Sequence, residues 1–308
     1  MTAFQNSGTI IINPSRSPHK QTIILLHDRG GDATGFGPAI LFKPLRVRRL
    51  RSNIYHSSQE TTTLKAKFPH AKFIFPTAAS QYSKASGHDL NQWFDNWPLH
   101  ATTNDPDDQM QNEWRNSLPI SGLRQTVRTL HELLEAEIGE LGGNASGIVL
   151  GGFGQGSAAS FISALLWEGK SLGALTGMCG WLPFVEDITR AALNEDADMT
   201  PADNGDNRET DQNTAIQRGV NKLRDILELP SSSTASLSSN ASIQNTQLFI
   251  AHAAQDGTVP IALGRRAGNC LEALGLDVER KEYMNGGHEC SEEILCDLVD
   301  FLWNTLDS

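Results

Sequence analysis

The chain is poor in cysteine and in positive charge, and it has no long apolar run. Its four cysteines show no C-x-x-C pairing of the metal-binding kind, and two lie within apolar stretches, which favours buried free thiols in a reducing compartment. A net charge of −11 argues against binding to nucleic acid or to an anionic membrane surface. We therefore expect neither a metal centre nor a nucleic-acid partner.

No segment has the pattern of a signal peptide or a transmembrane helix. The N-terminus lacks a basic stretch followed by an apolar one, and apolar runs such as Ile23–Leu26 are far too short to cross a bilayer. The expected location is the cytoplasm, without integral contact with a membrane. The one short basic run, Arg46–Arg51, is interpreted as a solvated face rather than a binding patch.

The sequence does contain an alternation of strand and helix patterns. Short apolar runs predict strands over 21–27, 71–75, 147–153, 175–180 and 248–251, because strands buried on both faces are continuously apolar. A further strand is predicted over 278–283. Apolar residues at three- and four-residue steps predict helices over 121–141, around 161–166, and over 261–274 and 294–302. This alternation predicts the α/β class, with one mostly parallel sheet flanked by helices on both faces. The length of 308 residues suits a single domain over 1–308.

A segment of different character, 195–245, interrupts this alternation. Residues 195–211 hold seven acids against one arginine, and residues 231–242 are mostly serine, threonine, alanine and asparagine. Neither stretch can bury much apolar surface, so we interpret the segment as a disordered surface insertion, with a short helix at 220–229 inside it.

The segment 147–160 has the pattern of a nucleophile elbow without its nucleophile. An apolar strand leads into a glycine-rich corner and then into a helix of small residues, but Gly154 stands where G-x-S-x-G has serine. Ser157 lies one helical turn further along, where its hydroxyl is expected to point away from the site and to serve packing.

Two further residues stand where a hydrolase triad has its acid and its histidine. The strand that ends at His252 leads into a loop with Asp256, and the strand at 278–283 leads into a glycine-containing loop with His288. The order nucleophile, acid, histidine, each after a separate strand, is the order of α/β-hydrolases. Taken singly, either residue is more often an ordinary loop residue. Their order predicts triad positions.

Together these stretches resemble the phospholipase/carboxylesterase family, which includes the acyl-protein thioesterases. The matching residues are 25–31, 75–78, 93–95, 151–156, 180–183, 256–260 and His288, in the family's order over 20–305. The form of 91–97 and the long insertion are similar to fungal members. The resemblance implies the α/β-hydrolase fold and cleavage of carboxylic esters or acyl thioesters, with an acylated protein as a possible substrate and without a metal or other cofactor.

Roles for individual residues follow from this resemblance. Asp256 would orient His288, which would act as the base, and the backbone N–H groups of Gln155 and Arg29 would form the oxyanion hole. An acyl channel would be lined by Trp93, Phe94, Trp181 and Leu182, for which core packing is the alternative role. The chain departs from the family pattern at Gly154 and at Asp28, where glycine is commoner.

The glycine at 154 should impair catalysis and leave the fold intact. Loss of a serine nucleophile costs about 8 kcal/mol of activation free energy, whereas glycine adopts the strained elbow backbone at little cost. Three interpretations follow: a hydrolase into which a Ser→Gly change was introduced, a natural pseudoenzyme that binds acyl groups or acylated proteins, or an interaction protein that uses the acidic insertion.

Overall fold

A seven-stranded sheet forms the centre of the protein in the computed structural model, which describes residues 8–48, 59–96, 98–99, 109–194, 208–230 and 241–306. Its strand order is β1-β5-β2-β8-β9-β10-β11. The strands are β1 (Ile10–Ile12), β2 (Gln21–Leu26), β5 (Ala71–Phe75), β8 (Ile148–Phe153), β9 (Ala174–Met178), β10 (Gln247–Ala253) and β11 (Val278–Tyr283). Only β1 runs antiparallel to its neighbour, and the other pairs are parallel. The predicted mostly parallel sheet is confirmed.

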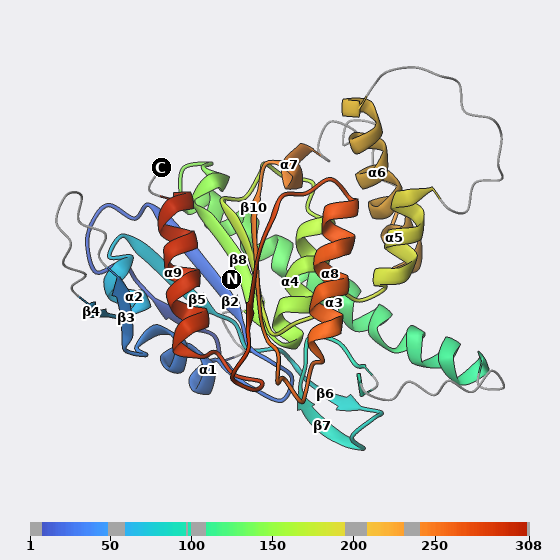
Figure 1. The fold of residues 1–308 in the computed structure, drawn as a ribbon, viewed down its shortest axis with the longest axis horizontal. Helices are drawn as coiled ribbons and strands as arrows, with labels where there is room; N and C mark the ends of the chain where they lie inside the picture. The colour runs from blue at the N-terminus through green and yellow to red at the C-terminus, as the bar shows by residue number, and fades with distance from the viewer. Residues whose placement is uncertain are drawn as a thin grey trace.

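Helices cover both faces of the sheet (Figure 1). One face carries α3 (Gln109–Glu140), α4 (Gln155–Leu165) and α8 (Ile261–Ala273), while the other carries α1 (Ala33–Leu41), α2 (Leu64–Lys67) and α9 (Glu292–Leu306). Alternate residues of β2 divide between the two layers: Ile24 joins the core under α3 and α4, and Ile23 joins the core under α1 and α9. A strand buried on both faces must be apolar throughout, which explains the continuous pattern of β2.

The predicted strands lie within a few residues of their expected places, while α3 and α6 (Arg208–Ile226) are much longer than expected. The helix expected over 121–141 begins at Gln109, and Gly142 and Gly143 follow its end with positive φ. Within the insertion, α6 replaces the expected short helix and packs against α5 (Val185–Leu193). Residues 195–207 and 231–240, expected to be disordered, lie outside the described residues.

Two small hairpins attach to the main sheet: β3 (Leu45–Arg48) pairs with β4 (Gln59–Thr62), and β6 (Ser80–Ser83) pairs with β7 (His88–Asn91). The start of the basic run lies in β3, where Arg46 donates through Nε and Nη2 to the Glu292 carboxylate at 2.9 and 2.8 Å. Residues 49–51 of that run lie outside the described residues. Arg46 thus serves to attach the hairpin to α9.

A four-residue helix, α7 (Ala241–Gln244), precedes β10.

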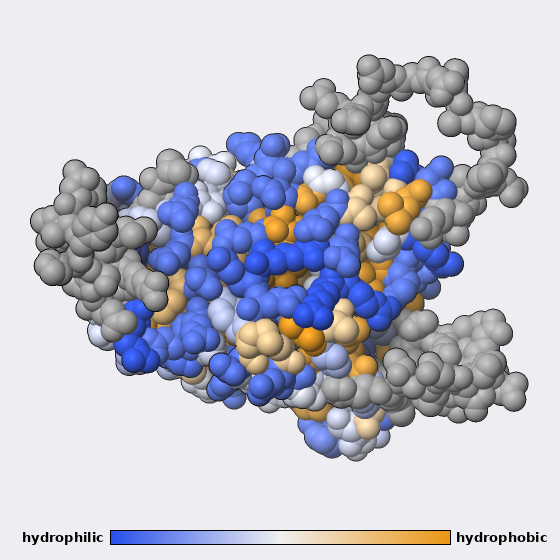
Figure 2. Space-filling model, in the orientation of Figure 1, coloured by the Kyte–Doolittle hydropathy of each residue, from blue (hydrophilic) through white to orange (hydrophobic). Residues whose placement is uncertain are grey.

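Hydrophilic residues predominate on the face drawn in Figure 2, with apolar residues in smaller groups, one of them beside α5 and α6. Among the described helices, none combines the length and the hydropathy needed to span a bilayer.

Candidate active site

The turn between β8 and α4 brings Gly154 to the carboxyl edge of the sheet. Its backbone has φ 56° and ψ −119°, a conformation that side chains other than glycine adopt only under strain. Its N–H donates to the carbonyl of Met178 at 3.0 Å, which ties the turn to the neighbouring strand. The sharp turn expected from the glycine-rich sequence is therefore present, with no side chain at its apex.

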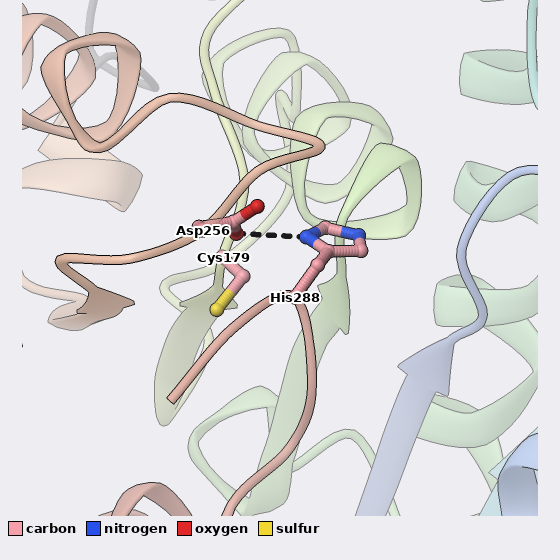
Figure 3. A group of neighbouring side chains, drawn as sticks. All are labelled: Cys179, Asp256 and His288. Carbon is pink, nitrogen blue, oxygen red and sulfur yellow. Dashed lines mark hydrogen bonds and ion pairs between the residues drawn. The ribbon is translucent and has the colours of Figure 1, made fainter. Parts of the chain in front are cut away.

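Asp256 and His288 lie together beside this turn. The His288 Nδ1 is 2.8 Å from Asp256 Oδ2, and Figure 3 shows the imidazole edge directed at the carboxylate. The other carboxylate oxygen, Oδ1, accepts the backbone N–H groups of Thr258 and Val259 at 2.9 and 2.8 Å. The structure thus brings together two residues 32 apart in sequence through parallel strands β10 and β11, whose carboxyl ends share one edge.

A second histidine, which the sequence did not indicate, lies under this carboxylate. His252 is buried, donates from Nε2 to the carbonyl of Val259 at 2.9 Å, and has the same nitrogen 3.4 Å from Asp256 Oδ2. Burial alone would raise the pKa of Asp256, but hydrogen bonds from His252, His288 and the two backbone N–H groups outweigh it and lower that pKa. Asp256 is therefore held as a carboxylate.

Asp28 occupies the space above Gly154. Its Oδ2 is 3.1 Å from His288 Nε2, and its Oδ1 accepts the backbone N–H of Gln155 at 2.6 Å. A Cβ placed on Gly154 would overlap Asp28 Oδ1 and would lie 3.0 Å from Asp28 Cβ. The carboxylate thus fills the position that a side chain at 154 would need, and it takes the N–H that we expected to serve an oxyanion.

His288 consequently lies between two carboxylates. Burial alone would lower its pKa, but the hydrogen bonds and charges of Asp256 and Asp28 outweigh burial and raise the pKa to about 9. Both ring nitrogens face carboxylate oxygens, an arrangement that suits a ring with a proton on each nitrogen. The imidazole is accordingly an imidazolium at neutral pH.

The end of β2 fixes the position of Asp28. The His27 Nδ1 is 2.6 Å from the carbonyl oxygen of Asp28, and the His27 Nε2 accepts the N–H of Ala78 at 2.9 Å. The His27 carbonyl in turn accepts the indole N–H of Trp93 at 2.8 Å. Burial lowers the pKa of His27, which suits this neutral tautomer with one donor and one acceptor nitrogen.

The other residues expected around the site occupy different settings. The Arg29 side chain donates to Gln92 Oε1 at 3.1 Å and to Ser83 Oγ at 2.5 Å, so it braces the β6–β7 hairpin. The backbone N–H of Arg29 meets no acceptor among the described residues. It remains available for the expected role in an oxyanion hole, which stays a prediction.

The four apolar residues expected to line an acyl channel are buried within the core of the α3–α4 face: Trp93, Phe94, Trp181 and Leu182. Phe94 and Trp181 meet edge to face, with ring centroids 6.0 Å apart. The Gln155 side chain holds this group by accepting the Trp93 N–H and donating to the Phe94 carbonyl. Core packing is thus present, and the channel role stays a prediction.

Two other potential nucleophiles, Cys179 and Ser157, lie near the site, but their environments do not suit nucleophilic attack. Cys179 lies beside Asp256 (Figure 3), and burial raises the pKa of its thiol to about 12, so it is not a thiolate nucleophile at neutral pH. Ser157 is fully buried, and its hydroxyl has no hydrogen-bond partner. Cys179, Asp256 and His288 offer possible metal-ligand atoms within 4.8 Å of one another. A metal ligand must be deprotonated, whereas the Cys179 thiol is protonated and His288 Nδ1 is hydrogen-bonded to Asp256, so these residues do not fit a metal ion.

The strand order, the sharp turn after a central strand and the acid–histidine pair in the following loops define an α/β-hydrolase. Solved structures share this fold: Zea mays acyl-protein thioesterase 2, with a TM-score of 0.59 and 19% identity, covers 97% of this chain and 99% of that one. Esterase PE8 has a TM-score of 0.60 and 16% identity, with 97% and 99% covered.

Sequence comparison supports the resemblance to a known family. Residues 52–200 match the phospholipase/carboxylesterase family. Acyl-protein thioesterase 1 of Gibberella zeae is 25% identical over 300 residues, which is 96% of each chain. A probable carboxylesterase SOBER1-like of Arabidopsis thaliana is 26% identical over 243 residues, 79% of this chain and 70% of that one. The resemblance predicted from the motifs is therefore confirmed, and it indicates a hydrolase of the carboxylesterase and acyl-protein thioesterase type.

Proposed function

We propose that this protein has the active site of a carboxylic ester or acyl thioester hydrolase in which the serine pathway is strongly impaired. In this proposal Gly154 occupies the nucleophile position, Asp256 orients His288, and the N–H groups of Gln155 and Arg29 form the oxyanion hole. The intact pairing of Asp256 with His288 at 2.8 Å supports the assignment of acid and base. The relatives named above support the substrate class.

The position of the Asp28 carboxylate is the observation that carries the proposed impairment. A substrate carbonyl oxygen could reach the Gln155 N–H only by displacing Asp28 Oδ1 from its 2.6 Å hydrogen bond. Even after such displacement, a nearby carboxylate would repel the negative charge that develops on the carbonyl oxygen. Loss of the serine alone costs about 8 kcal/mol in activation free energy, and the occupied donor adds to that cost.

A second candidate is a natural pseudoenzyme that binds acyl groups or acylated proteins without cleaving them. The observation in its favour is that the apolar residues Trp93, Phe94 and Trp181 pack around Gln155, the residue after Gly154. An apolar wall suits acyl binding, which needs no hydroxyl at 154. Binding of a palmitoyl thioester analogue without turnover would support this candidate.

Reaction with a fluorophosphonate probe tests the proposal, because the probe requires an activated nucleophile. The native chain should not be labelled, and S157A should behave like it. G154S should be labelled weakly, since Asp28 must rotate away from the new side chain. D28G/G154S should be labelled at position 154 and should cleave short p-nitrophenyl esters at least tenfold faster than G154S. An inert double variant that is correctly folded would refute the assignment of Asp256 and His288.

A further inference from the structure

The two oxygens of the Asp28 carboxylate have different partners, and this asymmetry suggests a chemical role. Oδ2 meets the N–H of His288 Nε2 at 3.1 Å, while Oδ1 accepts the N–H of Gln155 at 2.6 Å. The second of these donors lies at the first residue of α4, where a negative oxygen is also favoured by the helix dipole. The side chain is 26% exposed, so the carboxylate is accessible to a reactant.

We propose that Asp28 is a nucleophile that opens an epoxide by attack on a saturated carbon, forming an alkyl ester that His288 and water then hydrolyse. Carboxylates act as covalent nucleophiles in other hydrolytic enzymes. This inference goes beyond the ester or thioester hydrolysis proposed above, because it assigns this chain's own carboxylate and a different substrate class.

Attack on a saturated carbon suits the occupied donor better than attack on a carbonyl. An ester substrate needs the Gln155 N–H for its own carbonyl oxygen, which Asp28 Oδ1 already uses. Displacement at a saturated carbon places the developing charge on the leaving oxygen, so it makes no demand on that donor. His288 supplies the proton that this leaving oxygen requires. A halide leaving group would need no proton, so the strained cyclic ether is the better fit.

The first step balances with the groups present. Asp28 Oδ2 donates an electron pair to one epoxide carbon, and the bond between that carbon and the ring oxygen breaks. The ring oxygen takes the proton from His288 Nε2 and becomes a hydroxyl group. The products are a hydroxyalkyl ester on Asp28 and a neutral imidazole.

The second step uses the same hydrogen bonds in a different way. Neutral His288 removes a proton from water, and the resulting hydroxide attacks the carboxyl carbon of the Asp28 ester. The Asp28 Oδ1 becomes the oxyanion, and it already accepts the Gln155 N–H with an N···O distance of 2.6 Å, so this donor would stabilise the new charge. Collapse releases the vicinal diol, whose alkoxide takes the proton back from His288. Asp28, released as the carboxylic acid, then gives its proton to His288, which restores the carboxylate and the imidazolium. The net reaction is epoxide plus water to diol.

The charge on His288 changes in the direction that each step needs. Before reaction, the two carboxylates raise the pKa of His288 to about 9, so the ring can donate a proton. Esterification removes the charge of Asp28, one of the causes of that raised pKa, which favours the neutral ring as a base. Gly154 contributes space, because any Cβ there would overlap Oδ1.

Oxygen-18 labelling tests this inference with glycidyl phenyl ether as the probe. After several turnovers of the native chain in H2(18)O, the peptide containing Asp28 should gain 2 Da or more by mass spectrometry, because hydrolysis of its ester introduces water oxygen. H288Q lacks both the proton donor of the first step and the base of the second, so it should form neither diol nor label on Asp28 at the native rate. D28N should show neither product nor label.

Asp32 provides a matched control. It lies in the same loop, caps α1 by accepting the Gly35 N–H at 2.8 Å, and asparagine caps helices about as well as aspartate. D32N should therefore label Asp28 as the native chain does. Diol formation without label on Asp28, or the absence of both diol and adduct from folded protein, would overturn the inference. The fluorophosphonate test on D28G/G154S is independent, so the failure of one proposal does not decide the other.

Discussion

The stability of this protein should fall as the pH rises from 6.5 to 9, because His288 is protonated between two carboxylates. Its pKa in the folded state is about 9, above the ordinary value of 6.5. A group whose pKa is higher in the folded state stabilises the protein fully below its unfolded pKa, and this contribution is lost as the pH rises through the folded pKa. The window for His288 is therefore 6.5 to 9.

The size of this effect follows from the two pKa values. A rise from 6.5 to about 9 corresponds to about 3 kcal/mol of unfolding free energy, at 1.36 kcal/mol for each pKa unit. Asp28 and Asp256 both contribute to the raised pKa, so D28N should remove about half of the pH-dependent part, about 1–2 kcal/mol. Asparagine keeps the size of the side chain and removes its charge.

Urea unfolding from pH 6 to 9.5 measures this free energy, and NMR titration of the His288 ring measures its pKa directly. Burial raises the pKa values of Cys179 and Cys270 to about 12 and 11, so the thiols also reduce stability at alkaline pH. They do so in both proteins, and the difference between the native chain and D28N isolates the Asp28 contribution. An identical pH dependence in the two proteins, or a ring pKa near 6.5, would refute the reasoning.

Three further predictions concern stability and positioning. Lys72 and Glu137 form a buried ion pair at 2.7 Å. K72M should therefore lower the free energy of unfolding by about 3–5 kcal/mol, whereas K72M/E137L should leave it nearly unchanged. Chemical denaturation of both variants measures these losses, and equal losses would contradict the prediction. G154A should cost about 1–3 kcal/mol because its backbone has φ 56°, and D28G should recover part of that loss by removing the overlap with Oδ1; a thermally unchanged G154A would argue against the strain. H252F removes the contact with Asp256 and should lower the ring pKa of His288. In the D28G/G154S background, the same substitution should reduce esterase kcat about tenfold, equivalent to about 1.4 kcal/mol. An unchanged NMR titration of His288 would exclude a positioning role for His252.

Local patterning was enough to predict most of the sheet. Strands β5 and β11 begin and end at the expected residues, 71–75 and 278–283. Strand β5 is buried throughout and has the apolar pattern of a buried parallel strand, whereas β11 is a partly exposed strand at the edge of the sheet. The placement of Asp256 beside His288 also followed from the sequence. Residues in the loops after neighbouring parallel strands lie at the same edge of the sheet, independently of their side-chain conformations.

The tertiary structure alone decided what fills the space above Gly154. The sequence showed an aspartate after His27 and a glycine at 154, but their meeting depends on how the ends of β2, β8 and β11 pack. Asp28 and His288 are separated by 260 residues, and the His27 ring is hydrogen-bonded to the carbonyl of Asp28 and to the N–H of Ala78. The sequence by itself determined the scaffold and the acid–histidine pair. Packing determined that the Asp28 carboxylate lies directly against Gly154, because side-chain direction in a loop is set by its neighbours in space.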